Sequence, residues 1–239
     1  MTRIPVPNID YSEENMGKSM KLFSLVGLII GILMIILSKI LLRLNLNHII
    51  ISVLVVLFEV LITGAIHLDG LADTFDGIFS YRPKERILEI MKDSHVGTNG
   101  VIALIFSIII KTALIYEIIY YNLEDFILLM PIISRISSIF SCAFFNYARE
   151  NGMTKSFIEH TKPIHLLPSF LLAFIFIIFY YYYYHLNVSI SFASVILFSY
   201  IFSKYVTKKI GGITGDILGA IVEISEILYL FITIFIYIN

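Results

Sequence analysis

Seven apolar stretches, each long enough to cross a lipid bilayer, dominate this chain of 239 residues. A transmembrane helix needs about 20 predominantly apolar residues. The stretches lie at residues 22–43, 48–66, 100–120, 126–146, 166–185, 188–206 and 217–238. None of them shows the alternating apolar and polar pattern of a transmembrane β-strand. We therefore expect an all-α fold, a polytopic membrane helix bundle of about seven transmembrane helices that forms one integral-membrane domain over residues 1–239.

The composition agrees with this class and argues against others. Hydrophobic residues make up 58% of the chain and charged residues 15%, with a mean hydropathy of +0.89. No ordinary soluble domain is so apolar. The net charge of −1 gives no indication of nucleic-acid binding. The single cysteine, Cys142, cannot form an intrachain disulfide or a cysteine-based zinc cluster.

The basic residues predict how the chain is oriented in the membrane. Of the 17 Lys and Arg residues, 13 lie in the N-terminal segment 1–21, in the longer connections, or at the adjacent end of the sixth span. They are Arg3, Lys18, Lys21, Arg82, Lys84, Arg86, Lys92, Arg149, Lys155, Lys162, Lys204, Lys208 and Lys209. The positive-inside rule then places the N-terminus and these connections in the cytoplasm. The Ile- and Tyr-rich, Trp-free composition is typical of an AT-rich prokaryotic genome, so we expect a prokaryotic cell membrane.

The strongest chemical signal is HLDGLADTFDG, residues 67–77, directly after the second span. Spacings of four and three place Asp69, Asp73 and Asp76 on one face of a helix. Three carboxylates near hydrocarbon are costly and repel one another, and a divalent cation is the simplest means of holding them together. We therefore predict that these residues bind Mg²⁺ at the cytoplasmic mouth of the span. A solvated acidic cap beyond the helix is the structural alternative.

The connection 67–99 is expected to be the catalytic cytoplasmic segment. Gly70 and Gly77 have no side chains, which would let a phosphate approach the helix backbone closely. Residues 84–94 carry apolar positions among charges, a pattern that favours an amphipathic interfacial helix. Asp93 could be a fourth carboxylate of the site or an ordinary cap in that helix.

A glycine-rich turn, GGITGD at residues 211–216, opens the seventh span. Backbone N–H groups at a helix N-terminus bind phosphate well, which makes Gly212 a candidate phosphate contact. Asp216 suits the role of an N-terminal acid or of another metal ligand. A tight loop between two spans is the alternative interpretation of this turn.

Two basic residues, Lys111 and Arg135, lie inside predicted spans. Buried cations there usually face a cavity or a carboxylate. The acidic residues that could pair with them are Glu59, Glu117, Glu223 and Glu226. We expect ion pairing within the bundle for Lys111, whereas the planar guanidinium of Arg135 suits a phosphate. His67 could be a base, a phosphate donor or an interfacial histidine.

Together with RILEIMKDSHVGTNGVIAL, the acidic motif strongly resembles the cobalamin synthase family, also called adenosylcobinamide-GDP ribazoletransferases. TRIPVP at 2–7, YARENGM at 147–153 and GGITGDILGA at 211–220 are further landmarks of that family, in the expected order. The motif is also distantly similar to that of CDP-alcohol phosphotransferases, but Asp73 stands where lipid-making relatives carry Arg. His95 stands where the synthases usually carry Arg.

The resemblance implies an enzyme of cobalamin nucleotide loop assembly. It would join adenosylcobinamide-GDP to α-ribazole, or to α-ribazole 5′-phosphate, and release GMP. The implied Mg²⁺ ligands are Asp69, Asp73 and Asp76, with Asp93 or Asp216. Asp76 is the expected base for the ribazole hydroxyl, with Asp73 and His67 as further catalytic candidates. The candidates for phosphate or nucleotide charge are Lys92, Arg135 and Arg149.

Three alternatives stay open from the sequence. A CDP-alcohol phosphotransferase of phospholipid synthesis would release CMP. A transporter would carry acidic residues near the membrane midplane and broken helices. A scaffold for a biosynthetic complex would show no metal dependence. Membrane enzymes of this size often pair, so a homodimer is one oligomeric state that the sequence leaves open.

Overall fold

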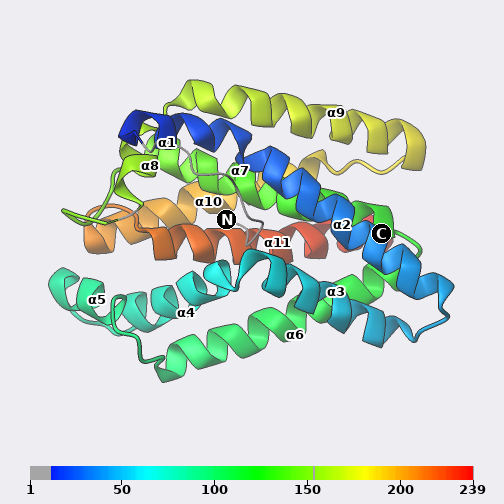
Figure 1. Cartoon of the computed structure of the whole chain (residues 1–239), viewed down its shortest axis with the longest axis horizontal. Coiled ribbons are helices and arrows are strands. Elements are labelled where there is room, and N and C mark those ends of the chain that lie inside the picture. The colour runs from blue at the N-terminus through cyan, green and yellow to red at the C-terminus, as the bar shows by residue number, and fades with distance from the viewer. Residues whose placement is uncertain (1–11, 153, 239) are drawn as a thin grey trace.

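A computed structural model describes residues 12–152 and 154–238, and in this part of the chain every named element is a helix (Figure 1). The longer helices are α2 (Phe23–Arg43), α3 (His48–Thr63), α6 (Thr98–Tyr120), α7 (Leu129–Phe144), α9 (Leu167–Tyr184), α10 (Ser189–Ile210) and α11 (Gly215–Ile238). The shorter ones are α1 (Glu13–Ser19), α4 (Ile66–Ile78), α5 (Lys84–Ile90) and α8 (Lys155–His160), with 3₁₀ turns η1 (Met20–Leu22), η2 (Glu124–Leu128) and η3 (Pro163–Leu166). The TRIPVP landmark lies outside the described residues.

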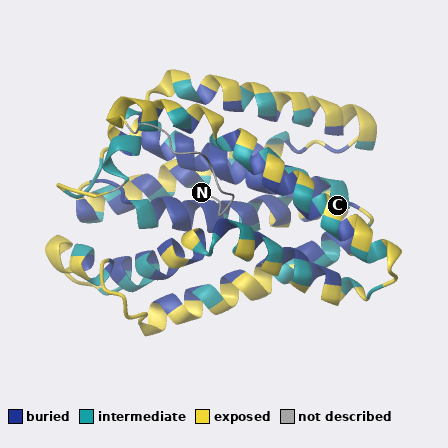
Figure 2. Cartoon of the chain, viewed as in Figure 1, coloured by how far each residue is buried: buried dark blue, intermediate teal, exposed yellow. Residues whose placement is uncertain are grey.

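Six helical segments of the described chain are long and apolar enough to cross a membrane, and a seventh is added if the bent pair α3–α4 is one span. Exposed positions, yellow in Figure 2, lie on the outer faces of the bundle. Large apolar residues such as Phe106 on α6 and Phe174 on α9 are among the exposed ones. Helices satisfy their own backbone hydrogen bonds, so lipid can cover such faces. The predicted polytopic all-α bundle is confirmed.

Helix α7 is the most buried of the spans, and small residues let its neighbours approach it closely. A Cβ atom added to Gly27 of α2 would lie 2.4 Å from the carbonyl oxygen of Pro131, and one on Gly31 would lie 2.6 Å from that of Leu128. On another side, Ser137 of α7 is hydrogen-bonded to Ser225 of α11 at 3.0 Å. This packing places α7 in contact with α2, α10 and α11.

The second span differs from the prediction of one helix over 48–66. Helix α3 ends at Thr63, and α4 leaves it at an angle of 89°. The bend is made by Gly64 and Ala65, which have left-handed φ angles of 68° and 60°. The Ala65 N–H donates to the Val60 carbonyl at 2.9 Å. The bend therefore gives a carbonyl at the end of α3 a hydrogen-bond donor, as a C-cap does. The acidic motif therefore forms its own helix, α4, which packs against α6 and α11.

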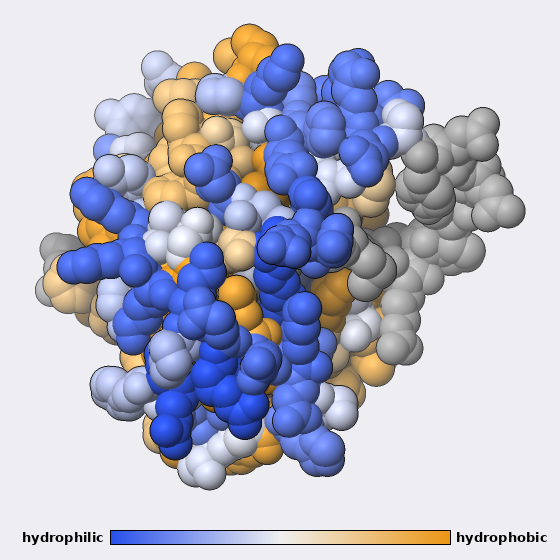
Figure 3. Space-filling model, turned by 90° about the vertical axis from the view of Figure 1, so that its left-hand side faces the viewer, coloured by the Kyte–Doolittle hydropathy of each residue, from blue (hydrophilic) through white to orange (hydrophobic). Residues whose placement is uncertain are grey.

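The connections predicted to be long or rich in glycine and charge meet at one end of the bundle, on the left of Figure 1. Helices α5 and α8 and the junction between α10 and α11 all lie there. Figure 3 views this end and shows hydrophilic side chains spread over most of it. The interfacial helix expected at 84–94 is shorter than predicted, because α5 covers only Lys84–Ile90.

Candidate active site

Four aspartates form the acidic face of the site: Asp69, Asp73 and Asp76 on α4, and Asp216 in the first turn of α11. The three other carboxylates all exert repulsive Coulomb interactions on Asp73, whereas Arg149 is the cation that acts on it. Asp69 is exposed and Asp73 is half-buried. The face is therefore a concentration of negative charge that one arginine only partly offsets.

Asp76 differs from the other members because both of its oxygens are hydrogen-bonded to the start of α6. The Gly97 N–H donates to Oδ2 at 2.7 Å and the Gly100 N–H donates to Oδ1 at 2.8 Å. A carboxylate stabilises the unpaired N–H groups and the positive end of a helix dipole. Asp76 thus caps α6 from α4. Both carboxylate oxygens already accept a hydrogen bond, so neither is fully available to accept a proton from a substrate. This disfavours Asp76 as the base.

Asp216 is held by neighbours at the α10–α11 junction. Its Oδ2 accepts a hydrogen bond from Arg149 Nη2 at 2.9 Å and one from Thr214 Oγ1 at 3.2 Å. Arg149 is brought there by the segment 146–148, where Tyr147 and Ile213 form an isolated parallel bridge. Asp216 is thus an N-terminal acid of α11, as one of the two predictions stated.

The oxygen-rich acidic face has the ligand chemistry that Mg²⁺ prefers. Among the described residues, however, no three Asp, Glu, His or Cys side chains converge closely enough to form a metal site by themselves. Mg²⁺ is usually bound by one or two carboxylates together with substrate phosphates and water. The exposed Asp69 and half-buried Asp73 fit that partial ligand set.

At the three glycines predicted to contact phosphate, Gly70, Gly77 and Gly212, the space that a side chain would occupy is filled by neighbouring protein. A Cβ on Gly70 would lie 2.7 Å from the Asp216 carbonyl oxygen of α11. One on Gly77 would lie 2.4 Å from Met91 Cγ, and one on Gly212 would lie 2.5 Å from the Asn146 carbonyl oxygen. The close approach that these glycines permit in the Cβ direction is that of neighbouring segments, and phosphate contacts at these positions stay a prediction.

His67 and Asp93 are also placed away from the acidic face. His67 is buried, and its Nε2 has no hydrogen-bond partner among the residues that the structure describes. It precedes Asp69 by two positions, which points its side chain to nearly the opposite side of the helix. Asp93 is exposed in the loop after α5, where the backbone N–H and the ring of His95 lower its pKa. Neither residue joins the four aspartates.

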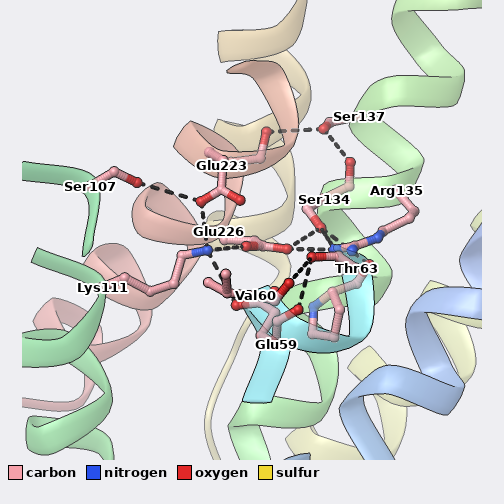
Figure 4. A network of polar contacts seen from close by, with 12 residues as sticks. Glu59, Val60, Thr63, Ser107, Lys111, Ser134, Arg135, Ser137, Glu223 and Glu226 are labelled. Carbon is pink, nitrogen blue, oxygen red and sulfur yellow. Dashed lines mark hydrogen bonds and ion pairs between the residues drawn. The ribbon is translucent and has the colours of Figure 1, made fainter. Parts of the chain in front are cut away.

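Arg135 lies in a buried charge network formed by Glu59, Lys111, Arg135, Glu223 and Glu226 (Figure 4). Its Nη1 is 2.5 Å from Glu226 Oε1, and no part of it is accessible from outside. The prediction that Arg135 contacts phosphate is therefore not supported. Ion pairing of Lys111 with Glu59 was expected and is confirmed at 3.2 Å, but Glu117 does not take part in the network shown.

The structure does bring Lys92 and Arg149 together, in a pocket of about 450 Å³ between α5 and residues 148–151. We call it the cationic pocket because three basic residues of its lining outnumber the two acidic ones, Glu85 and Glu150. Lys84 also lines this pocket, and sequence reasoning missed it as a site residue although it stands in the charged run RPKER. Arg149 belongs both to the pocket and to the ion pair with Asp216. The pocket is thus next to the acidic face, an arrangement suited to an anionic substrate bound together with a divalent cation.

Comparisons with known proteins agree with this chemistry. The family model described as cobalamin-5-phosphate synthase matches residues 1–234. An adenosylcobinamide-GDP ribazoletransferase of Fusobacterium nucleatum is 41% identical, with 97% of this chain and 93% of the relative covered. One of Clostridium acetobutylicum is 43% identical, with 96% and 90% covered. No solved structure matches the chain with significance.

Proposed function

Since the chain belongs to the cobalamin-5-phosphate synthase family, we propose that it is an adenosylcobinamide-GDP ribazoletransferase that acts in cobalamin nucleotide loop assembly. It joins adenosylcobinamide-GDP to α-ribazole, or to α-ribazole 5′-phosphate, and releases GMP. The observation that carries the proposal is the full-length family match on a chain whose acidic face adjoins a cationic pocket. A diphosphate substrate needs a divalent cation, which the acidic face would bind, and basic side chains, which the pocket supplies.

Mg²⁺ is the proposed cofactor, and Asp69 and Asp73 are its proposed protein ligands, with Asp216 beside them. When bound, the ion would neutralise the diphosphate and the departing phosphate. Lys84, Lys92 and Arg149 are proposed to bind the phosphates of the nucleotide, because three cations line one pocket. Such charge-assisted contacts orient the substrate and hold the leaving group.

The reaction needs a proton acceptor but no covalent nucleophile. The ribazole 3′-hydroxyl oxygen attacks the phosphorus attached to the cobinamide arm, and the bond from that phosphorus to the GMP oxygen breaks. Asp73 is the proposed acceptor of the hydroxyl proton, through a carboxylate oxygen that Mg²⁺ leaves free, since Asp76 is committed to capping α6.

The site is proposed to face the cytoplasm of a prokaryotic cell. The basic residues of the longer connections support this orientation through the positive-inside rule, and the relatives compared are bacterial. Nucleotide substrates and Mg²⁺ are available on that side. A homodimer stays a prediction.

The test is purification in detergent followed by incubation with adenosylcobinamide-GDP, α-ribazole and Mg²⁺, with GMP and the corrinoid product measured. A parallel reaction with a CDP-alcohol and a lipid acceptor would release CMP if the phospholipid alternative held. The α3–α4 bend and the buried charges are features that a transporter would also show. Corrinoid flux into sealed vesicles without GMP release would favour that alternative and contradict the proposed transferase.

A further inference from the structure

The buried charge network joins α3, α6, α7 and α11 (Figure 4). Lys111 Nζ of α6 lies 2.7 Å from Glu223 and 2.6 Å from Glu226 of α11, and 3.2 Å from Glu59 of α3. Arg135 of α7 completes the network through Glu226. One cation thus contacts three carboxylates from two helices, and one carboxylate is shared by two cations.

Such a network is costly to place inside a membrane protein. Each of the five side chains is at most 7% exposed, and charges removed from water lose solvation that pairing does not fully restore. Intramembrane ionisable residues therefore usually have a function. None of the five lines the cationic pocket or belongs to the acidic face, so direct contact with substrate is not that function.

The network links the helices that position the acidic face. Glu226 is ten residues after Asp216 on α11, a separation of about 15 Å along one rigid helix. Lys111 is on the helix whose first N–H groups hold Asp76. Glu59 is one turn before the α3–α4 bend, and its carbonyl accepts a hydrogen bond from Thr63 at 2.8 Å. Movement at the network would therefore be transmitted to each part of the face.

We propose that the buried charge network is a positioning device for the acidic face. It fixes α3, α6 and α11 relative to one another, so that Asp69 and Asp73 of α4 and Asp216 of α11 stay in the register that binds a divalent cation. The inference rests on the metal role given to the acidic face under the proposed function. The five residues are positioning residues, since they act on the cation only through the helices that carry them.

The test uses Mn²⁺ alone as the probe, with free Mn²⁺ measured by electron paramagnetic resonance in the presence of the detergent-purified full chain. Glu226→Gln keeps the shape of the side chain but removes the charge that Lys111 and Arg135 share. We expect the dissociation constant for Mn²⁺ to rise by roughly tenfold, the effect typical of losing a residue that supports metal ligands. Glu226→Asp, which keeps the charge, should recover part of that affinity.

The control is Lys39→Met, which removes a lysine from another ion pair of similar length. Lys39 lies 2.6 Å from Asp125, and its side chain is 49% exposed. This variant should bind Mn²⁺ as the wild type does. Helical circular dichroism and gel filtration establish that each variant is folded.

A folded Glu226→Gln variant with wild-type Mn²⁺ affinity would overturn the proposal. If that variant does not fold, Glu223→Gln replaces it, because it leaves the Arg135–Glu226 pair intact; unchanged affinity there also overturns the proposal. The Mn²⁺ measurement contains no substrate, so it can contradict the positioning proposal without bearing on the proposed transferase activity. Wild-type protein that binds Mn²⁺ yet releases no GMP contradicts the transferase alone.

Discussion

The carboxylate of Asp76 on α4 lies 2.8 Å from the backbone nitrogen of Gly100 in the first turn of α6. This contact ties the motif helix to a span 24 residues further along the chain. It also explains why glycine stands at both capped positions, since a Cβ on Gly97 or Gly100 would lie within 2.5 Å of the Asp76 carboxylate.

Gly100→Ala is therefore expected to separate α6 from α4. The added methyl group also meets the Ala72 carbonyl at 3.0 Å, so the strain cannot be relieved by moving one side chain. We expect a loss of about 1–3 kcal/mol in stability, the usual cost of overpacking, together with reduced turnover. Thermal unfolding and GMP release measure the two effects. Asn99→Ala, an exposed position in the same turn, is the control and should change neither.

Asp69→Asn and Asp73→Asn should abolish most of the turnover without unfolding the chain. Both side chains are accessible, so an isosteric amide costs little packing, but it removes a charge proposed to hold Mg²⁺. We expect roughly a 100-fold loss in turnover, the size typical of losing one electrostatic stabiliser of a transition state. Asp93→Asn should lose less than either, because that residue pairs with His95 instead. An Asp93→Asn loss as large as that of Asp73→Asn would contradict the assigned ligand set.

Gly70→Ala and Gly77→Ala should differ in their effects although both glycines lie on α4. At Gly70 the new methyl group meets the backbone of Asp216, which can move only with α11. At Gly77 the nearest atoms belong to the flexible side chain of Met91. We expect a loss of about 1–3 kcal/mol at Gly70 and a smaller one at Gly77, measured by thermal unfolding. Equal losses would mean that α4 is not held tightly against α11.

Lys92→Met should weaken binding of the nucleotide-bearing substrate more than it slows chemistry. Lys92 lines the cationic pocket and is exposed, so its loss removes one charged contact without disturbing the bundle. We expect KM for adenosylcobinamide-GDP to rise by roughly tenfold, the equivalent of one charge-assisted hydrogen bond. Lys155→Met, a lysine of the same end that does not line the pocket, should leave KM unchanged. A fall in turnover at unchanged KM would contradict the assignment of Lys92 to substrate binding.

The spans could be predicted from the sequence because hydrophobic length alone determines them. The expected stretch 22–43, for example, differs by one residue from α2 at Phe23–Arg43. The break after Thr63 was missed because no proline marks it, and Gly64 reads as an ordinary residue among apolar neighbours. The break decides where the aspartates lie, which is why they were predicted at the end of a span and not on a separate packed helix.

Within the site, spacing predicted that Asp69, Asp73 and Asp76 share a helix face, but not what each carboxylate contacts. The role of Asp76 depends on α6, and that of Gly70 depends on α11. Lys92 and Arg149 share a pocket that only the folded chain brings together. The pairing of Arg135 with Glu226 likewise depends on which face of α7 meets α11. Contacts of this kind between helices cannot be predicted from a single sequence.

The most direct test of the central claim is the stoichiometry of product formation by the purified chain. The wild type, supplied with adenosylcobinamide-GDP, α-ribazole and Mg²⁺, should release one GMP for each adenosylcobalamin formed, and chelation of the metal should stop both together. The Asp73→Asn variant should form neither product at a comparable rate. GMP release without the corrinoid product, or corrinoid product at an unchanged rate after chelation, would contradict the account.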